Sequence, residues 1–389
     1  MLMALFVRQG KNTPAGQLIL FQNLIRQRSF NRCVALFQQL PQLHTHKLRP
    51  LHHSQTFSFS TSPSSSNTMP HFLQQSGRDI TAKFHNIKLL EDQRVHDALV
   101  NKESSKWSMI VGQRASKINR NRYSNVFPFD NNRVKLALAP GSTKSDYINA
   151  SHITVDLNDT PRQYIAAQGP EEQTVSHFWQ MVLQQTAEGS EVAIAMVTPL
   201  AENGIDKCFK YWPDTLSQVV ELSSEPDDFE HDLRIECLGC HELGDIEGTF
   251  YTMLKLDALD PETKEVVSTR NVHHIYYTKW VDMKRPSVWN SIHSLSDLLG
   301  NLNGSENPLI VHCSAGVGRS GTFITLDYLF HNEKLLLKPD GKHDLIEDIV
   351  SQLRKQRIMM VQSLDQFKFC YEALAAFFRD LTRNTPFPA

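Results

Sequence analysis

Five stretches of the chain carry apolar residues at the spacing of an α-helix. In the last of them, the apolar side chains recur every three or four residues, which places them on one face of a helix. These side chains are Phe367, Tyr371, Leu374 and Phe378. Helices are expected over about residues 80–101, 171–185, 320–330, 344–357 and 363–381.

Other segments have the composition of β-strands. Residues 191–197 (EVAIAMV) form a short apolar run that predicts a buried strand, and residues 308–312 (PLIVH) are a second β-type segment. Three further segments predict strands in an antiparallel run, at residues 233–240, 249–256 and 272–280. Strands mixed with helices predict the α/β (α+β) class, with a twisted mixed sheet flanked by helices.

The composition is that of an ordinary globular protein. Of the 389 residues, 40% are hydrophobic and 21% are charged. No apolar run reaches the length of about 18 residues that predicts a transmembrane helix. The 6 cysteines are scattered without a framework spacing, which favours a reducing compartment.

The net charge of −2 hides an uneven distribution. Residues 1–78 hold eight basic side chains and no acidic one, which leaves 32 of the 40 basic residues against all 42 acidic ones in the remainder. Nucleic-acid binding needs a broad basic face. The acidic body therefore argues against a nucleic-acid partner.

The stretch 312–322 (HCSAGVGRSGT) carries the most chemistry. It lies between a β-type segment and a helical pattern, so it predicts a strand, a tight loop and a helix N-terminus. The backbone N–H groups of such a loop point at one spot, with the positive end of the helix dipole behind them. A dianion such as a phosphate fits there, with the sulfur of Cys313 at its centre.

The residue types in this loop suit a thiolate nucleophile. Beside an arginine at a helix N-terminus, the pKa of a thiol can fall to roughly 3.5–7.5. Gly316, Gly318 and Gly321 let the backbone bend tightly and approach a ligand. Arg319 can bind two phosphate oxygens through its planar fork. The alternative is a buried core cysteine before an ordinary strand–helix turn, which would not need this combination.

HCSAGVGRSGT resembles the signature of the classical, cysteine-dependent protein-tyrosine phosphatases. Six other segments agree with that family in the same order: NRYSNVFPFDNNRVKL (121–136), DYINAS (146–151), YIAAQGP (164–170), HFWQMV (177–182), KCFKYWP (207–213) and MVQSLDQF (360–367). The resemblance runs from about Met69 to the C-terminus and is greatest to the small fungal cytosolic members.

The resemblance implies a single catalytic domain that hydrolyses phosphotyrosine in proteins through a phosphocysteine intermediate. In that mechanism Cys313 attacks phosphorus, and Arg319 holds the phosphate oxygens together with the loop residues Ser314, Ala315, Gly316, Val317 and Gly318. Tyrosine-phosphorylated proteins are the expected partners, with a role in signalling. No metal or organic cofactor is needed, and a monomer is expected.

Residues 1–68 precede this region and differ from it. They are rich in Gln, Ser and Arg and end in SFSTSPSSSNT. An acid-free N-terminus rich in Arg and Ser resembles a mitochondrial transit peptide. The alternative, which we favour, is a disordered or normally untranslated segment, because Met69 opens the region that resembles the family. We expect an extension (1–68) and a catalytic domain (69–389) in the cytoplasm, or in mitochondria if the extension is a translated transit peptide.

Two aspartates compete for the role of general acid, which protonates the tyrosine oxygen. The family uses an aspartate in a loop with the sequence WPD. Trp212-Pro213-Asp214 has these letters but lies in KCFKYWP, which matches a different family segment. Asp282 lies about thirty residues before Cys313, where the family's acid belongs, and we choose it. Val281 stands in place of the family's proline, which leaves the closing equilibrium of the loop open.

Gln362 and Gln366 match the family's pair of glutamines that position water. In the second half-reaction a water attacks the phosphocysteine, and Asp282 would then act as base. Ser363-x-x-Gln366 is also a capping box for the last helix, so Gln366 has a structural explanation as well.

Several other residues lie at family positions, and some of them also have a structural explanation. Tyr123 matches the aromatic that stacks on the phosphotyrosine ring, and its alternative is a core tyrosine. Asn125 stands where many relatives have an aspartate that grips the peptide. Glu202 matches a carboxylate that orients the arginine, and Lys207 matches a lysine that meets the acid loop; both could be solvated. Two loop neighbours complete the set: Ser320, which could bond the sulfur or cap the helix, and His312, which braces the loop.

The sequence also contains features of two other functions and of one other motif. A pseudophosphatase that binds phosphotyrosine without turnover is supported only by Val281, since nucleophile and acid are both present. A dual-specificity phosphatase needs a shallow pocket, against which Tyr123 argues. The C-x-x-C-H pattern at residues 237–241 spells a haem-attachment motif, but no secretory signal and no second cysteine pair accompany it.

Overall fold

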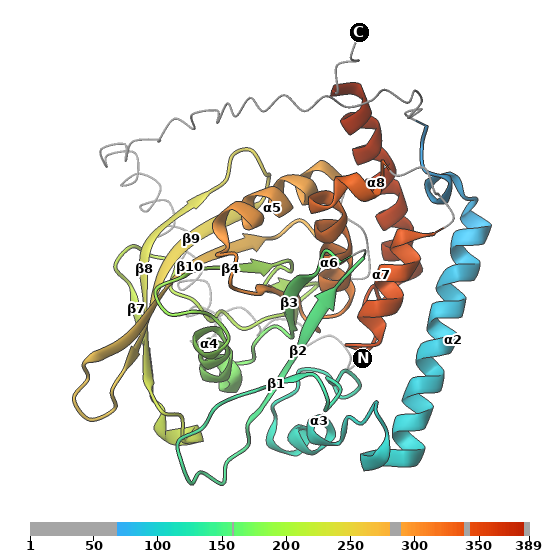
Figure 1. The fold of residues 1–389 in the computed structure, drawn as a ribbon. Coiled ribbons are helices and arrows are strands. Elements are labelled where there is room, and N and C mark those ends of the chain that lie inside the picture. The colour runs from blue at the N-terminus through green and yellow to red at the C-terminus, as the bar shows by residue number, and fades with distance from the viewer. Residues whose placement is uncertain (1–67, 158, 281–288, 338–342, 385–389) are drawn as a thin grey trace, which may run out of the picture.

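The fold is taken from a computed structural model that describes residues 68–157, 159–280, 289–337 and 343–384 (Figure 1). Its α-helices are α2 (Gly77–Asn101), α3 (Ile110–Ala115), α4 (Val175–Gln184), α5 (Trp289–Leu302), α6 (Gly318–His331), α7 (Leu345–Arg354) and α8 (Leu364–Asn384). Short 3₁₀ helices are η1 (His71–Gln74), η2 (Lys102–Ser104), η3 (Ser116–Ile118), η4 (Glu172–Thr174), η5 (Glu225–Asp227) and η6 (Glu333–Leu335).

The described strands form one large sheet and one small hairpin. The nine-stranded sheet has the order β1-β2-β3-β11-β4-β10-β9-β8-β7, and β5 pairs with β6. The strands are β1 (Arg133–Lys135), β2 (Tyr147–Val155), β3 (Arg162–Ala167), β4 (Glu191–Met196), β5 (Ala201–Glu202), β6 (Ile205–Asp206), β7 (Val219–Leu222), β8 (Asp232–Glu242), β9 (Thr249–Leu259), β10 (Val266–Tyr277) and β11 (Leu309–His312). The α/β class with a mixed sheet flanked by helices is confirmed.

Parallel strands occupy the centre of the sheet and antiparallel strands its two sides. β3, β11, β4 and β10 run parallel, whereas β1 and β2 at one side and β9, β8 and β7 at the other pair antiparallel. The three strands predicted as an antiparallel run are therefore confirmed as β8, β9 and β10. β10 begins earlier than predicted and also pairs in parallel with β4.

Both faces of the central strands are buried, which explains their unbroken apolar sequence. Along β4, Ala193 and Ala195 face one core and Ile194 and Met196 face the other. The first core lies under α2, α5, α6, α7 and α8, and the second under α4 (Figure 1). The run EVAIAMV is hydrophobic throughout because neither face of the strand meets water.

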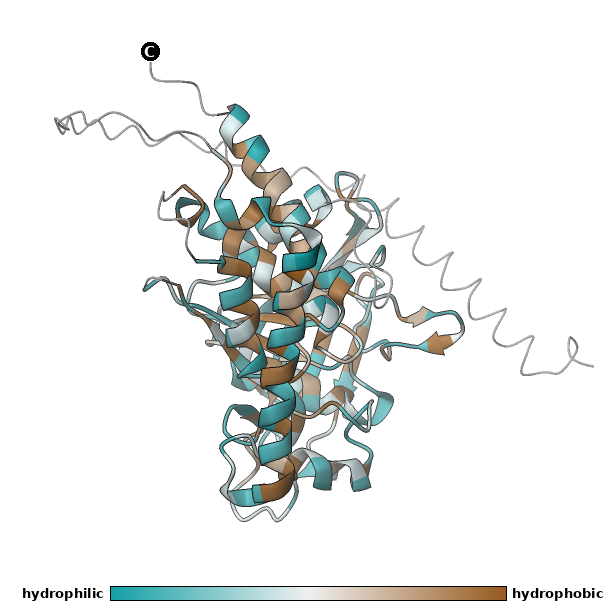
Figure 2. Cartoon of the chain, turned by 90° about the vertical axis from the view of Figure 1, so that its right-hand side faces the viewer, coloured by the Kyte–Doolittle hydropathy of each residue, from teal (hydrophilic) through white to brown (hydrophobic). Residues whose placement is uncertain are grey.

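Helix α2 packs on this assembly through one stripe of residues. It begins after Ser76, whose side-chain oxygen accepts a hydrogen bond from the backbone N–H of Asp79 at 3.2 Å. Its buried face carries Ile80, Phe84 and Ile87. Figure 2 looks onto the outer face of α2, which is mostly hydrophilic. Among the described helices, none combines the length and hydrophobicity needed to cross a bilayer.

The loops that leave the carboxyl ends of the parallel strands meet at one edge of the sheet. Residue 313 follows β11, Gln168 follows β3, and Trp280 follows β10. In open α/β sheets, ligands bind at this edge, outside the carboxyl ends of the strands. The candidate site therefore lies at this edge of the sheet.

Candidate active site

The loop from Cys313 to Val317 joins β11 to α6 and forms a tight cradle around the Cys313 sulfur. The thiol is 3% exposed, and the backbone N–H of Gly316 donates to its Sγ at 3.2 Å. Gly316 has a φ of +69°, and a Cβ there would lie 2.1 Å from the carbonyl oxygen of Ala167. Only glycine fits this close approach of the loop to β3.

Burial and electrostatics act on the Cys313 thiol in opposite directions. Burial alone would raise the pKa of the thiol, but the charge of Arg319, the hydroxyl and amide of Ser320 and the amide of Val317 outweigh it, and the pKa is lowered from its usual value. A lowered pKa favours the thiolate, which is the nucleophilic form of cysteine.

Arg319 connects the loop with two other elements of the site. Its side chain is 1% exposed, and its Nη1 donates to the carbonyl oxygen of Trp280 at 2.9 Å. The same nitrogen lies 3.5 Å from both carboxylate oxygens of Glu202 on β5. The guanidinium therefore lies between the carboxylate of Glu202 and the backbone of Trp280, which follows β10.

Two glutamines pack against the N-terminus of α6. A Cβ at Gly318 would lie 3.0 Å from both polar atoms of the Gln366 amide and 3.2 Å from the Cβ of Gln362. Gln366 also forms the predicted capping box: its Oε1 accepts from the backbone N–H of Ser363, whose Oγ accepts from the N–H of Gln366. The Nε2 of Gln366 is buried and has no hydrogen-bond partner among the described residues.

Tyr123 lies at the edge of the cradle. It is half-buried, and its hydroxyl forms a 2.8 Å hydrogen bond with the hydroxyl of Ser314. Its neighbour Arg122 fixes the backbone on this side, because its Nε and Nη2 donate to the carbonyl oxygens of Gly169 and Pro170 at 3.0 and 2.6 Å. Asn125 is exposed.

Comparison with known proteins decides the family. Residues 117–376 match the family model described as protein-tyrosine phosphatase. The chain is 37% identical over 342 residues to tyrosine-protein phosphatase 1 of Saccharomyces cerevisiae. This alignment covers 81% of this chain and 98% of the relative. It is 34% identical over 297 residues to tyrosine-protein phosphatase 2 of Schizosaccharomyces pombe, with 75% of this chain and 38% of the relative covered.

The chain belongs to the protein-tyrosine phosphatase family. The expectation of a protein-tyrosine phosphatase, and thus a hydrolase, is confirmed.

Solved structures agree with this assignment. The catalytic domain of human protein tyrosine phosphatase non-receptor type 18 superposes with a TM-score of 0.63 at 28% identity, over 77% of this phosphatase and 96% of that chain. A complex of PTPN18 with a HER2 phospho-peptide gives a TM-score of 0.62 at 30% identity, over 77% of this phosphatase and 99% of that chain.

The two aspartates considered as general acid have different positions in the phosphatase. Asp282 and Val281 lie outside the described residues, but Trp280 just before them contacts Arg319. Asp214 pairs with Lys210, and its carbonyl oxygen accepts from the thiol of Cys240 at 3.1 Å. The carboxylate of Asp214 is therefore paired with a lysine, and the choice of Asp282 as the general acid stays a prediction.

Lys207 and Glu202 belong to the same small hairpin of the phosphatase. Glu202 is on β5, and Lys207 follows β6, with its backbone N–H donating to the carbonyl oxygen of Leu200 at 2.8 Å. The carbonyl oxygen of Lys207 lies 3.0 Å from the point where a Cβ at Gly169 would be. The hairpin thereby brings both predicted residues to the edge of the site.

His312 is buried behind the cradle in a chain of hydrogen bonds. Burial lowers the pKa of His312 to about 4, so the ring is neutral at physiological pH. Its Nδ1 donates to the carbonyl oxygen of Cys313 at 3.2 Å, because that oxygen can only accept. Its Nε2 then accepts from the hydroxyl of Tyr211 at 2.6 Å, and the Tyr211 oxygen accepts from Nε2 of His274 at 2.7 Å.

Sequence reasoning missed the most buried support of the cradle, Arg357. This fully buried side chain donates to the carbonyl oxygens of Gly316 at 2.8 Å and Ala315 at 3.0 Å. It also reaches Asn149 at 2.7 Å and Ser151 at 3.1 Å on β2. A basic residue at the end of a predicted helix is usually a solvated partner of the helix dipole, so spacing alone gave no signal. Tyr211 and His274 were also missed. They come from segments far from Cys313 in the sequence, so no local pattern connects them with the cradle.

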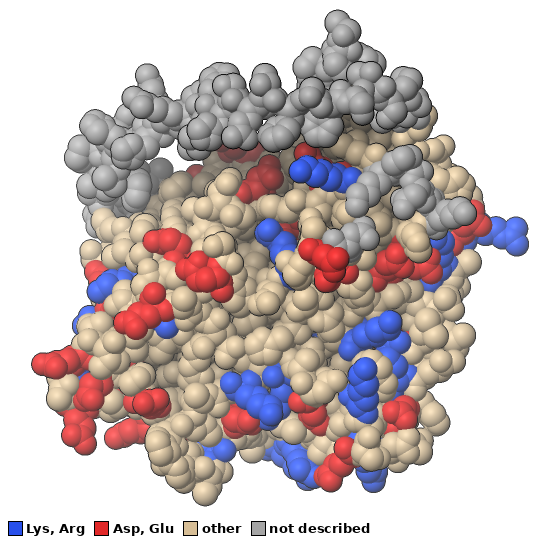
Figure 3. All heavy atoms as spheres, in the orientation of Figure 1, with Lys and Arg blue, Asp and Glu red and all other residues tan. Residues whose placement is uncertain are grey.

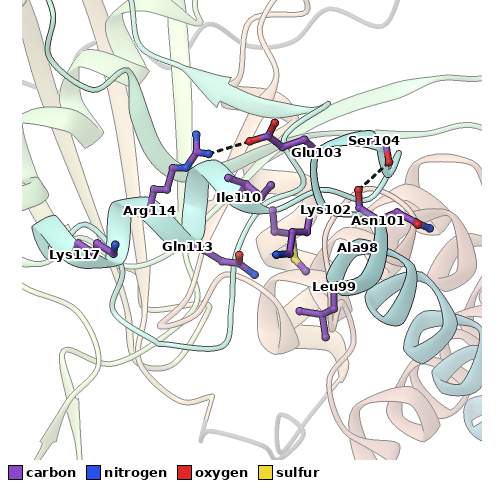
Figure 4. A pocket seen from close by; sticks show the side chains of 11 residues that line it. Ala98, Leu99, Asn101, Lys102, Glu103, Ser104, Ile110, Gln113, Arg114 and Lys117 are labelled. Atoms are coloured by element: carbon purple, nitrogen blue, oxygen red, sulfur yellow. Dashed lines mark hydrogen bonds and ion pairs between the residues drawn. The ribbon is translucent and has the colours of Figure 1, made fainter.

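The other candidate features do not form a site in the described part of the phosphatase. No group of three or more His, Cys, Asp or Glu side chains there could hold a metal ion. Cys237 and Cys240 are buried within β8. The hollow in Figure 4, of about 610 Å³, lies between the end of α2 and α3 and is lined by surface residues such as Lys102, Gln113 and Arg114.

Proposed function

We propose that this phosphatase hydrolyses phosphotyrosine in proteins through a phosphocysteine intermediate, and that this activity serves signalling. The single observation that carries the proposal is the Cys313 thiol. Its pKa is lowered within a backbone cradle beside the buried Arg319. A thiolate in a cradle of N–H donors is suited to attack a phosphoryl group and to stabilise its oxygens.

In the first half-reaction the Cys313 thiolate attacks phosphorus in line with the tyrosine oxygen. The P–S bond forms as the P–O bond breaks, and Asp282 transfers its proton to the leaving phenolate oxygen. The equatorial phosphoryl oxygens accept hydrogen bonds from the backbone of Ser314, Ala315, Gly316, Val317 and Gly318 and from Arg319. Glu202 is proposed to hold the guanidinium in this orientation, and Lys207 to meet the loop of Asp282.

In the second half-reaction a water molecule attacks the phosphocysteine. Gln362 and Gln366 orient this water, and Asp282 accepts its proton as the new P–O bond forms and the P–S bond breaks. The unpartnered Nε2 of Gln366 supports such a role beyond the capping box, since a buried amide N–H without a partner is costly. Ser320 lies beside the sulfur and would stabilise the departing thiolate.

We further propose that Tyr123 stacks on the ring of the phosphotyrosine and sets the depth of the pocket. Its half-buried ring beside Ser314 supports this role. A deep pocket would admit phosphotyrosine and leave phosphoserine short of the sulfur. The similar structures solved with HER2 phospho-peptides support phosphorylated proteins as partners.

The organisation of the whole chain is also a proposal. We propose that residues 69–389 form the catalytic domain, that residues 1–68 are an extension, and that the protein acts as a monomer in the cytoplasm. The similarity to the Saccharomyces cerevisiae phosphatase over 98% of its length supports a single catalytic unit. A reducing compartment would preserve the Cys313 thiolate.

The deciding experiment compares hydrolysis of phosphotyrosine and phosphoserine peptides by four proteins. Cys313→Ser should abolish turnover and retain binding, because the hydroxyl is a far weaker nucleophile. Asp282→Ala should slow turnover by roughly 10²–10⁴-fold through loss of the general acid. Asp214→Ala is the matched control and should leave turnover near that of the wild type.

Three outcomes would contradict the proposal. Wild-type protein that binds phosphotyrosine peptides without turning them over would be a binding module. Equal hydrolysis of phosphoserine would contradict the deep pocket. A damaging Asp214→Ala with a harmless Asp282→Ala would reverse the assignment of the acid.

A further inference from the structure

One residue on the buried stripe of α2 is charged. Glu91 continues the spacing of Ile80, Phe84 and Ile87 and is 5% exposed. Its Oε2 accepts from Nη1 of Arg354 at 3.0 Å, and its Oε1 accepts from the backbone N–H of Met359 at 2.7 Å. One oxygen of this carboxylate therefore binds the last residue of α7, and the other binds the segment that follows α7.

Arg354 is held by the same segment. This side chain is 2% exposed, and its Nε and Nη2 donate to the carbonyl oxygens of Met360 at 2.9 Å and Val361 at 2.8 Å. Together, Glu91 and Arg354 bind backbone groups of three consecutive residues, 359, 360 and 361. Two of these residues have left-handed backbone, Met359 with a φ of 59° and Val361 with a φ of 56°.

Left-handed backbone is unfavourable for a branched residue such as Val361 and persists only where neighbouring structure imposes it. The side chains that bond to this backbone are the carboxylate of Glu91 and the guanidinium of Arg354. If these bonds were lost, the left-handed residues would have fewer groups that hold them in place, and we expect the backbone up to the next residue to shift.

The residue that follows is Gln362. Residues 359–361 also contact the cradle, because the backbone N–H of Val361 donates to the carbonyl oxygen of Val317 at 3.2 Å. The Cβ of Gln362 lies 3.2 Å from the point where a Cβ at Gly318 would be. A change in the backbone of residues 359–361 would therefore move Gln362 relative to the cradle.

We propose that Glu91 is a positioning residue for the second half-reaction: with Arg354 it fixes the backbone of residues 359–361 so that Gln362 holds the attacking water. The proposal rests on the function proposed above for Gln362. Glu91 lies outside residues 117–376, which match the family model, so it would be a contribution of helix α2 to the chemistry.

Stability alone does not account for a carboxylate at this position. Buried ion pairs can often be replaced by packed apolar side chains without loss of stability. The stripe of α2 is otherwise apolar in this region, and a leucine there would continue it. A carboxylate gains what a leucine cannot, which is a hydrogen bond to the strained backbone at Met359.

The test separates the two half-reactions in full-length protein with para-nitrophenyl phosphate. The initial burst of para-nitrophenol reports the first step, and phosphocysteine trapped by rapid acid quench reports the second. In Glu91→Gln, the rate of the first step should stay within about twofold of the wild type, and the rate of the second step should fall about tenfold. Phosphocysteine should therefore accumulate, because a mispositioned water affects only the second step. Equal slowing of both steps, or an unchanged phosphocysteine level, would overturn the inference.

Two control variants make the result specific. Asp327→Asn alters another fully buried carboxylate, which pairs with Arg162 at 2.8 Å near the far end of α6, and should leave the ratio of the two steps unchanged. Gln362→Ala should itself accumulate phosphocysteine. If it does not, the role of Gln362 in the proposed function fails; if it does and Glu91→Gln does not, only the inference about Glu91 fails.

A folding defect in Glu91→Gln would be detected by circular dichroism. In that case the double variant Glu91→Leu/Arg354→Met removes both charges together and avoids an unpaired buried arginine. It should fold and show the same selective loss of the second step. A folded double variant with the wild-type ratio of the two steps would also overturn the inference.

Discussion

At the scale of single residues, the charge of Arg319 is the largest of the effects that lower the pKa of the Cys313 thiol. The thiol is buried, and burial by itself favours the neutral form. The pKa is nevertheless lowered, because the guanidinium, the Ser320 hydroxyl and the loop amides together exceed the cost of burial. The thiol therefore begins to ionise at a lower pH than an ordinary cysteine. In the proposed mechanism, the nucleophile and the binding of the phosphate both depend on this arginine.

This dependence predicts different outcomes for Arg319→Met and Arg319→Lys. Arg319→Met removes the charge, so the pKa of Cys313 should rise and its alkylation by iodoacetamide should require higher pH. Arg319→Lys keeps a charge but loses the planar fork, so the alkylation midpoint should stay nearer that of the wild type. Turnover should still fall by roughly 10²–10³-fold, the effect of losing one transition-state donor. An unchanged midpoint in Arg319→Met would contradict the charge as the cause.

At the scale of elements, the cradle depends on one loop glycine that fits against β3. Gly316→Ala would combine left-handed backbone with a Cβ 2.1 Å from the Ala167 carbonyl oxygen. Gly189 is a matched control, because its φ is +67° and nothing lies within 4 Å of its Cβ position. Gly189→Ala should cost about 1–2 kcal/mol of stability without loss of activity.

Gly316→Ala should cost more stability than that control and reduce kcat/KM by roughly 10²-fold, because the loop donors would be displaced by about 1 Å. Thermal unfolding and hydrolysis of para-nitrophenyl phosphate measure the two effects. Equal effects of both substitutions would mean that backbone strain alone, and not the contact with β3, constrains the loop.

The sequence predicts those elements of the phosphatase that are local in the chain. The loop around Cys313, the capping box at Ser363 and the helical stripe before Arg354 follow from spacing over a few residues. The residues that hold the site in place from other parts of the chain cannot be predicted in this way. Arg357 reaches the cradle from behind, and Glu91 reaches the segment before Gln362 from a helix more than 200 residues away, at a sequence separation of 268 from Met359. No periodicity distinguishes such residues from solvated ones before the fold is known.

At the scale of the whole molecule, the sheet joins segments from distant parts of the chain, and α2 packs against the helices α7 and α8 (Figure 1). Acidic and basic groups are interspersed with uncharged areas over the face seen in Figure 3. The packing of α2 bears on where the catalytic unit begins. Ile80, Phe84 and Ile87 are buried in the larger core, so α2 is part of the folded unit although it precedes the residues that match the family model.

Two shortened proteins test this boundary. A chain that starts at Met69 should keep the thermal midpoint and a kcat/KM within about twofold of the full chain, because it retains α2 and every predicted site residue. A chain that starts at Lys102 would lose three buried apolar side chains, at about 1.5–3 kcal/mol each, and would leave Arg354 without Glu91. That loss approaches the whole stability of a typical domain, about 5–15 kcal/mol, so circular dichroism should show that this chain is unfolded.

Two outcomes would contradict this boundary. If the chain from Met69 were inactive while the full chain is active, residues before Met69 would belong to the catalytic unit. If the chain from Lys102 were stable and active, α2 would not be needed for catalysis, and the proposed effect of Glu91 on Gln362 would be wrong.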